Sequence, residues 1–198
     1  MTKGRLEAFS DGVIAVIITI LVLELKIPHG SDFAALRPLV PTFLSYLMSF
    51  MFIAIYWNNH HHMLQAIKHV NGPVLWANMH LLFWLSLVPF TTAWMGENHF
   101  AGAPASAYGV NLLMAAIAYT ILARSLIHLH GRQSAIATAI GADFKGYVSL
   151  AMYAIAIPIS FVNATIAWSL YAAVAILWLV PDRRFERALA AHHSHSPE

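Results

Sequence analysis

The chain contains no cysteine and very little charge. The absence of cysteine excludes disulfide frameworks, iron–sulfur clusters and thiol catalysis. Charged residues make up only 10% of the 198 residues, whereas a soluble domain carries about 25%. The net charge of +2 comes from scattered basic residues, so the sequence predicts no nucleic-acid partner. With 59% hydrophobic residues, the composition indicates an integral membrane protein embedded in a lipid bilayer.

Six apolar segments follow one another, each close to the ~20 residues that cross a bilayer. They are residues Gly12–Ile27, Pro38–Trp57, Val74–Trp94, Ala105–Ile127, Gly146–Val162 and Ala164–Val180. The first has no small-residue cleavage motif, so we interpret it as a spanning helix and not as a signal peptide. The predicted fold class is therefore all-α, with six transmembrane helices in one domain over residues 1–187. Residues 188–198 are expected to form a disordered cytoplasmic tail that contains histidines.

The lysines and arginines are distributed unevenly between the two sides of the membrane. An even number of spans places both termini on one side, and nine of the 11 basic residues fall on that side. These nine are Lys3, Arg5, Lys68, Arg124, Arg132, Lys145, Arg183, Arg184 and Arg187, against Lys26 and Arg37 on the other side. Because cytoplasmic loops carry the excess of positive charge, both termini are predicted to be cytoplasmic.

Polar residues stand where the first segment enters the membrane. Arg5 is followed by Ser10, Asp11 and Gly12, with no break before the apolar run. An ionisable residue at membrane depth costs about 2.5–3.5 kcal/mol, so it is rare without a partner or a role. One interpretation is that Ser10 or Asp11 caps a helix. Capping explains one of the four residues, so a functional cluster is the favoured interpretation.

Helical spacing collects one stripe of residues on the first segment. At 100° per residue the stripe contains Gly12, Val16, Thr19, Ile20, Leu23 and Ile27, and continues through Phe9 and Arg5 toward the cytoplasm. Ser10 and Asp11 lie on the opposite side. An apolar stripe in a membrane helix usually packs against protein or lipid, so spacing alone does not predict a pore.

A second group of polar residues is predicted at the same cytoplasmic depth. Trp57, His60 and His61 close the second segment, and Asn78 lies in the first turns of the third. Hydrogen bonds among these side chains and the polar start of the first segment would keep charged groups paired where water is scarce. We expect this network to anchor the first helix against the second and third.

The chain resembles the bacterial branch of the transmembrane protein 175 family, which includes the endosomal and lysosomal potassium channel of animals. The resemblance is carried by Arg-x-x-x-Phe-Ser-Asp-Gly from Arg5, Tyr-Trp-x-x-His-His from Tyr56 and Trp-x-Asn from Trp76. It implies a potassium-permeable, weakly to moderately selective cation channel in a prokaryotic cell membrane, with no cofactor beyond the permeant potassium ions. It also implies a homotetramer in which four copies of the first helix line one central pore.

The resemblance further assigns the pore constriction to the stripe on the first helix. Val16, Ile20 and Leu23 would form successive apolar rings, with Thr19 as a polar ring. Val16 occupies a position that is often isoleucine or leucine in relatives, so a wider constriction with weaker potassium selectivity is expected. Glu24 near the outer mouth would raise the local cation concentration, or would pair with Lys26 or Arg37 at the interface.

Two other functions remain open from the residues themselves. Asp11 could carry ions in a coupled transporter, although no internal repeat is visible. The clusters of His60, His61 and His62 with His69, and of His128 with His130, could hold iron in a membrane enzyme. A third histidine cluster of suitable spacing and second-shell carboxylates are lacking, so no metal site is predicted.

Overall fold

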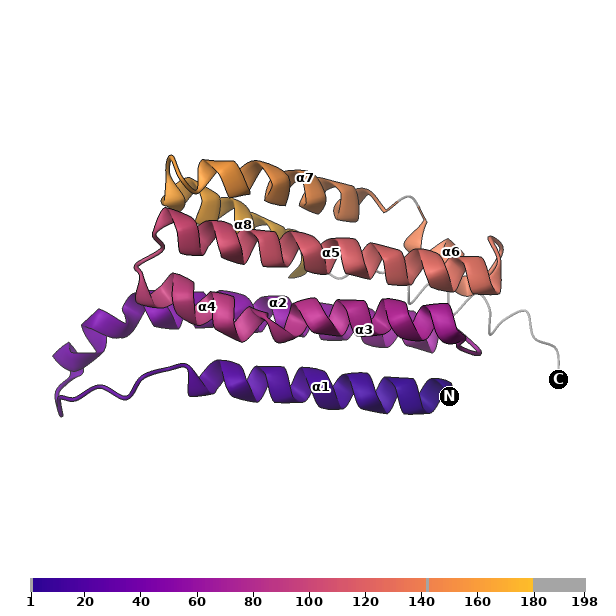
Figure 1. Ribbon diagram of the computed structural model, residues 1–198, viewed down its shortest axis with the longest axis horizontal. Helices are drawn as coiled ribbons and strands as arrows, with labels where there is room; N and C mark the ends of the chain where they lie inside the picture. The colour runs from indigo at the N-terminus through magenta and orange to yellow at the C-terminus, as the bar shows by residue number, and fades with distance from the viewer. Residues whose placement is uncertain (1, 142, 180–198) are drawn as a thin grey trace.

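The computed structural model describes residues 2–141 and 143–179, and the regular elements within them are helices (Figure 1). In chain order they are α1 (Lys3–Leu23), the 3₁₀ helix η1 (Phe33–Leu39), α2 (Val40–Gln65), α3 (Gly72–Ser86), α4 (Val88–Glu97), α5 (Gly102–His130), α6 (Ala135–Ile140), α7 (Phe144–Ile159) and α8 (Ala164–Leu179). Each of the six predicted segments has a helical counterpart. The short helices η1 and α6 were not predicted.

The helices run nearly parallel to one long axis and are arranged in tiers (Figure 1). α1 lies along one edge and packs on α2, α3 and α4, and α5, α7 and α8 lie beyond that middle tier. Four stretches are long and apolar enough to cross a membrane, namely Lys3–Leu23, Phe33–Gln65, Gly72–Glu97 and Gly102–His130. α7 and α8 are also apolar but have 16 residues each.

The first helix begins earlier and ends sooner than the sequence predicted. α1 covers Lys3–Leu23, whereas the apolar run suggested Gly12–Ile27. Its N-cap is Thr2, whose side-chain oxygen accepts a first-turn backbone N–H at 3.4 Å. Ser10 and Asp11 therefore lie two turns inside the helix, and the interpretation of either as the cap is wrong. The start predicted from hydropathy is wrong because the helix begins in the polar sequence that precedes the apolar run.

The second helix is longer than its apolar run. α2 continues to Gln65, eight residues beyond the predicted end at Trp57, so the histidines His60–His62 are helical. Neither glycine nor proline interrupts this stretch, and the next helix start is set by Asn71, which caps α3 through the N–H of Val74 at 3.1 Å. The helical extension places the histidines on defined faces of α2.

The third predicted segment is broken in two. Pro89 has no backbone N–H and sits in the first turn of α4, immediately after α3 ends. At the break, the Trp84 carbonyl and the Val88 N–H do not bond to each other as they would in a continuous helix. The side-chain amide of Asn111 on α5, in the orientation that pairs with both, donates from its nitrogen to the Trp84 carbonyl at 2.9 Å and accepts at its oxygen from the Val88 N–H at 3.2 Å. Neighbouring helices commonly restore such hydrogen bonds at proline breaks in membrane proteins.

The helices behind α1 form a tightly paired scaffold. The Ser49 hydroxyl hydrogen-bonds the Tyr108 hydroxyl at 2.9 Å, and the Tyr171 hydroxyl donates to the Ala105 carbonyl at 3.1 Å, so these buried hydroxyls are satisfied. Gly96 allows α4 to approach α2 closely, because a Cβ there would lie 2.8 Å from the Thr42 Cα. α1 thus packs on a framework that is held together independently of it.

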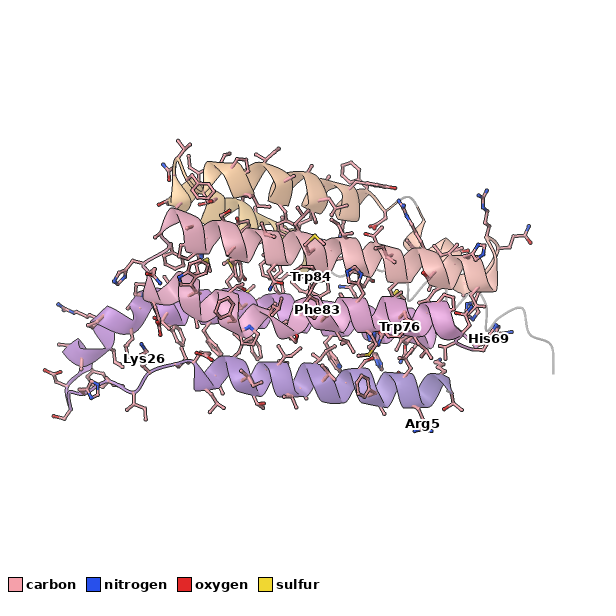
Figure 2. All side chains as sticks on the ribbon, in the orientation of Figure 1. Arg5, Lys26, His69, Trp76, Phe83 and Trp84 are labelled. Carbon is pink, nitrogen blue, oxygen red and sulfur yellow. The ribbon has the colours of Figure 1, made fainter. Side chains whose placement is uncertain are left out.

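The two ends of the bundle carry different charged residues. Figure 2 shows Lys26 at one end and Arg5 and His69 at the other. The Lys3 Nζ donates to the Gln65 carbonyl at 3.3 Å, which places the start of α1 beside the end of α2. The basic residues after Leu179, the predicted domain boundary at residue 187 and the tail at 188–198 lie outside the described residues.

Candidate functional site

The two faces of α1 differ sharply in burial. The face turned toward the other helices is buried along its length, at Leu6, Ser10, Ile14, Ile17 and Leu21. The opposite face, here called the open face, is exposed along its length, at Arg5, Phe9, Gly12, Val16, Thr19, Ile20 and Leu23. Ile17 is 3% exposed while Ile20, one turn away, is 40% exposed. The open face therefore contains the predicted stripe from Arg5 to Leu23, whereas Ile27 lies beyond the end of α1, and the exposed side is wider than the stripe, since Val22 is also 46% exposed.

The hydroxyl of Thr19 is oriented by its own helix. Its Oγ1 donates to the Val16 carbonyl at 2.7 Å, which uses the only hydroxyl hydrogen. The remaining lone pairs of this oxygen are free to act as acceptors on the open face. Thr19 therefore leaves an acceptor oxygen exposed in an otherwise apolar stretch.

A buried hydrogen-bond chain joins α1 to α3 and α2. Asn78 donates to the Ser10 Oγ at 2.9 Å, and Ser10 in turn donates to the Leu6 carbonyl at 2.9 Å. The Asn78 Oδ1 lies 2.7 Å from the His60 Nε2. Because that oxygen only accepts, His60 must carry its proton on Nε2. All three polar side chains are fully buried, so each bond replaces water that is not available there.

A second set of polar contacts lies beside this chain. The Trp57 Nε1 donates to the Asp11 Oδ1 at 3.0 Å, and the Trp57 ring stacks on the His61 ring with centroids 5.8 Å apart. The His61 Nδ1 lies 3.5 Å from the Glu7 Oε1, and its Nε2 lies 2.8 Å from the Gln65 amide. Glu7 was not predicted as a member. Its position one turn before Asp11 on the same side of α1 was the available signal.

The structure divides the predicted network into two groups. The residues it brings together are Ser10, Asp11, Trp57, His60, His61 and Asn78. Phe9 and Gly12 are exposed on the open face, and the Arg5 side chain points away from the other helices (Figure 2). Among the described residues that side chain makes no hydrogen bond or ion pair. Arg5, Phe9 and Gly12 therefore lie on the open face of α1 and not beside the polar contacts.

Glu24 lies where α1 ends, at the other end of the bundle. It is half-buried and borders a hollow shared with Trp94 and Glu97. Lys26, one expected partner, instead pairs through its Nζ with the Glu97 Oε1 at 2.8 Å. Within the described residues neither Lys26 nor Arg37 forms an ion pair with Glu24, so the Glu24 carboxylate is not neutralised by either of them.

His130 hydrogen-bonds backbone groups at the basic end of the bundle. The His130 Nε2 accepts the Lys68 N–H at 3.2 Å, and its Nδ1 donates to the Leu126 carbonyl at 3.0 Å. Both ring nitrogens are therefore engaged, and the His69 ring lies beside them with centroids 4.7 Å apart. In the described part of the chain, no group of three or more histidine, aspartate and glutamate residues is placed to hold a metal ion.

Comparison with known proteins identifies the family. The family model for the endosomal/lysosomal potassium channel TMEM175 matches residues 5–89. A potassium channel of Chryseobacterium sp. (strain P1-3) is 55% identical over 189 residues, which are 96% of this chain and 98% of that relative. The chain belongs to the TMEM175 family. The resemblance inferred from the motifs is thus confirmed, and the chain is a member of an ion channel family and not a membrane metalloenzyme.

A solved structure and an animal relative extend the comparison. The crystal structure of a lysosomal potassium-selective channel TMEM175 homologue from Chamaesiphon minutus has a TM-score of 0.79, with 29% identity over 91% of this chain and 97% of that one. The endosomal/lysosomal proton channel TMEM175 of Bos taurus is 36% identical over 86 residues, or 37% of this chain and 18% of that protein. The chain is therefore a multi-pass helical membrane protein with a TMEM175-like fold.

The region that the family model matches is the region that carries the site. Residues 5–89 run from Arg5 through α1, α2 and α3 to the proline break. They include the open face of α1 from Arg5 onward and the contacts of Glu7, Ser10 and Asp11 with α2 and α3, but not the Lys3–Gln65 hydrogen bond. The family model thus ends before α5, α7 and α8, whereas the relative from Chryseobacterium and the structure from Chamaesiphon minutus also cover those helices.

Proposed function

We propose that this chain is a potassium-permeable cation channel and that α1 lines its pore in a homotetramer. One observation carries the proposal: the open face of α1 is uncovered along the whole helix, although the opposite face is buried at Leu6, Ser10, Ile14, Ile17 and Leu21. The related bacterial proteins named potassium channels support the choice of ion. A single α1 cannot surround an aqueous path, so several copies must meet through this face.

Four open faces around one axis would stack rings of side chains along the pore. Val16, Ile20 and Leu23 would form apolar rings at one-turn intervals, and Thr19 would add a ring of oxygens beside them. A hydrophobic constriction gates by dewetting, and a modest widening restores the water column. The exposed lone pairs of Thr19 would ligate a partly dehydrated cation between the apolar rings.

Selectivity would then follow from the cost of dehydration. Potassium holds its hydration shell less tightly than sodium, so a narrow apolar ring favours potassium without a specific cage. Val16 is one methylene smaller than isoleucine or leucine, and its ring would be wider and easier to hydrate. Weak to moderate selectivity is the consequence. Glu24 at the other end of α1 would raise the cation concentration at the outer mouth.

The polar contacts behind α1 would hold the pore-lining helix in register. The buried chain through Ser10, Asn78 and His60 fixes the rotation of α1, and the Asp11–Trp57 hydrogen bond fixes its inner end. A rotation of α1 by one residue would turn a different set of side chains toward the axis. The excess of basic residues at this end supports cytoplasmic termini in a bacterial cell membrane, with residues 1–187 as the channel domain.

Cross-linking tests the assembly directly because the natural chain has no cysteine. Leu23→Cys should form oxidised dimers of the chain in the membrane, since four copies would meet at the axis. Ile155→Cys on α7 is a matched control, being 54% exposed but on the far side of the bundle from α1. Cross-links through the Ile155 position but not through the Leu23 position would remove α1 from the axis.

A coupled transporter is the second candidate, and the break between α3 and α4 favours it. Discontinuous helices are typical of secondary transporters, and Pro89 produces such a break here. The break is repaired by Asn111, however, and lies beside α5 and not on the open face of α1. Currents from proteoliposomes decide between the two: passive flux that reverses at the potassium Nernst potential supports the channel. A reversal potential that follows a second ion would support the transporter.

A further inference from the structure

A slot opens on the surface of the molecule between α5 and α7, far from α1. Its volume is about 360 Å³, within the range of about 300–1,000 Å³ that small-molecule sites occupy. Its walls are largely aliphatic, from Ile117, Ile121 and Ile127 on α5 to Leu150 on α7. Since α1 lies along the opposite edge of the bundle (Figure 1), this slot is separate from the proposed pore.

Two opposite charges line the slot without forming an ion pair with each other. The Arg124 Nη2 donates to the Tyr147 hydroxyl at 3.2 Å, which leaves further guanidinium donors free. The Asp143 Oδ1 accepts the Gly146 N–H at 3.0 Å and caps α7. Arg124 and Asp143 both border the slot, yet among the described residues no ion pair joins them. The slot thus presents a separate cation and a separate anion.

The charged side chains of the slot are expected at the depth of lipid head groups. With Gly102, the first residue of α5, taken as one boundary of the hydrocarbon core, Arg124 lies about 33 Å along the helix at 1.5 Å per residue, beyond the ~30 Å of that core. Ile117 lies about 10 Å deeper on the same helix. Arg124 would therefore meet the interface while Ile117 and Leu150 face acyl chains, which is the polarity of a phospholipid lying along α5.

We propose that this slot binds one phospholipid whose head group joins a phosphate to a primary ammonium, the chemistry of phosphatidylethanolamine. The phosphate would accept hydrogen bonds from the Arg124 guanidinium and from the Tyr147 hydroxyl, which is free to donate because it accepts from Arg124. The ammonium would donate to the Asp143 carboxylate. An acyl chain would lie over Ile117 and Leu150.

The same charges discriminate against other lipids. Phosphatidylglycerol would bring an anionic phosphate beside Asp143 and offer no cation in return. Phosphatidylcholine carries a positive charge but has no N–H to donate. Charge-assisted hydrogen bonds are the strongest polar contacts available here, so phosphatidylethanolamine should be preferred over both.

Native mass spectrometry of the purified full chain tests this site, with the three lipids supplied on identical acyl chains. Wild type should retain one phosphatidylethanolamine per chain. Arg124→Gln should weaken all three lipids, and Asp143→Asn should abolish the preference over phosphatidylcholine while keeping the helix cap, since asparagine caps well. Each change should lower phosphatidylethanolamine affinity about tenfold, the loss expected for a hydrogen bond to a charged group. Tyr147→Phe, which removes one hydroxyl, should weaken the phosphate contact without altering the fold.

Arg37→Gln is the matched control, because it removes an exposed arginine at the opposite end of the bundle. Equal retention of the three lipids, unchanged in the Arg124 and Asp143 variants, would mean an ordinary lipid annulus and overturn the proposal. Equal binding of soluble glycerophosphoethanolamine would replace the lipid by a soluble phosphate compound. Lipid retention does not depend on ion conduction, so the result is independent of whether α1 lines the pore.

Discussion

The two faces of α1 are both apolar, yet one is packed and the other is open. Ile14, Ile17 and Leu21 on the packed face would suit the open face by composition, and Val16 and Ile20 would suit the packed one. In a bilayer lipid tails are as apolar as leucine, so hydrophobicity does not decide which face a neighbour covers. What differs is the polar attachment: Ser10 and Asp11 carry hydrogen bonds to α3 and α2, and the open face has none.

The largest effect is expected from breaking the buried chain at its centre. Asn78→Ala removes the partner of both Ser10 and His60 and leaves the His60 Nε2–H buried without an acceptor. An unsatisfied buried polar group costs about 1–3 kcal/mol, so loss of both contacts should destabilise the chain by about 2–4 kcal/mol. Thermal unfolding in detergent measures this loss.

Asn98→Ala is the control for that experiment. Asn98 is exposed, and among the described residues its side chain hydrogen-bonds within its own helix end, to the Trp94 carbonyl at 2.8 Å. Its replacement should change the unfolding free energy by no more than about 0.5 kcal/mol. If the Asn78 variant unfolded at the wild-type temperature, the packed face would not depend on the polar chain.

A smaller effect is expected at the partly exposed end of the attachment. Asp11→Ala removes the acceptor of the Trp57 Nε1 and should cost about 1–2 kcal/mol. Asp11→Asn keeps an oxygen in place and should cost less. A double-mutant cycle with Trp57→Phe isolates the pair, since the second change should have little effect once the first is made. Additive losses would show that Asp11 acts through another partner.

The Arg5→Ala variant separates an effect on the stability of the subunit from an effect on assembly of the tetramer. The Arg5 side chain lies on the open face and has no partner in the described part of the chain, so Arg5→Ala should leave unfolding of the subunit within about 0.5 kcal/mol of wild type. We expect it to lower the tetramer fraction, measured by light scattering in detergent. Arg37→Ala at the other end should alter neither. If the variant lost subunit stability but still formed tetramers, Arg5 would belong to the polar network that anchors α1.

The polar partners of α1 were predictable because their chemistry is costly at membrane depth. Ser10, Asp11, Trp57, His60 and Asn78 each had to find a partner, and the helix order placed them at one level. The stripe on α1 was predictable for a related reason, since period 3.6 fixes which residues share a face. The helical period does not predict whether that face contacts lipid or other copies of α1.

Other features of the fold could not be predicted from the amino-acid sequence alone. The early start of α1 depends on a cap at Thr2, which lies in polar sequence beyond the apolar run. The break after α3 was signalled by Pro89, but its repair by Asn111 joins positions far apart in the chain, and a lone asparagine in an apolar segment names no partner. The separation of Arg5 from Asp11, by contrast, follows from helical spacing, which already placed the two residues on different sides of the helix.

Wetting the open face should raise ion flux several-fold. Ile20→Asn would place one amide per chain in the proposed constriction, and dewetting depends on both radius and polarity. Potassium flux into proteoliposomes measures the change. Ile17→Asn is the matched control on the packed face, where the amide would be buried and should destabilise the chain without raising flux. Equal flux from wild type and the Ile20 variant would remove this ring from the ion path.

The smallest effect, and the finest test of the two faces, concerns selectivity at Val16. Val16→Ile should narrow the inner ring and raise the preference for potassium over sodium by no more than about fourfold, because one added methylene changes a transfer energy by only about 0.8 kcal/mol. Val16→Ala should lower it. Ile17→Val is the packed-face control, because Ile17 is only 3% exposed. Reversal potentials under paired potassium and sodium gradients report the ratio, and equal shifts from Val16 and Ile17 would show that packing, and not the ring, sets selectivity.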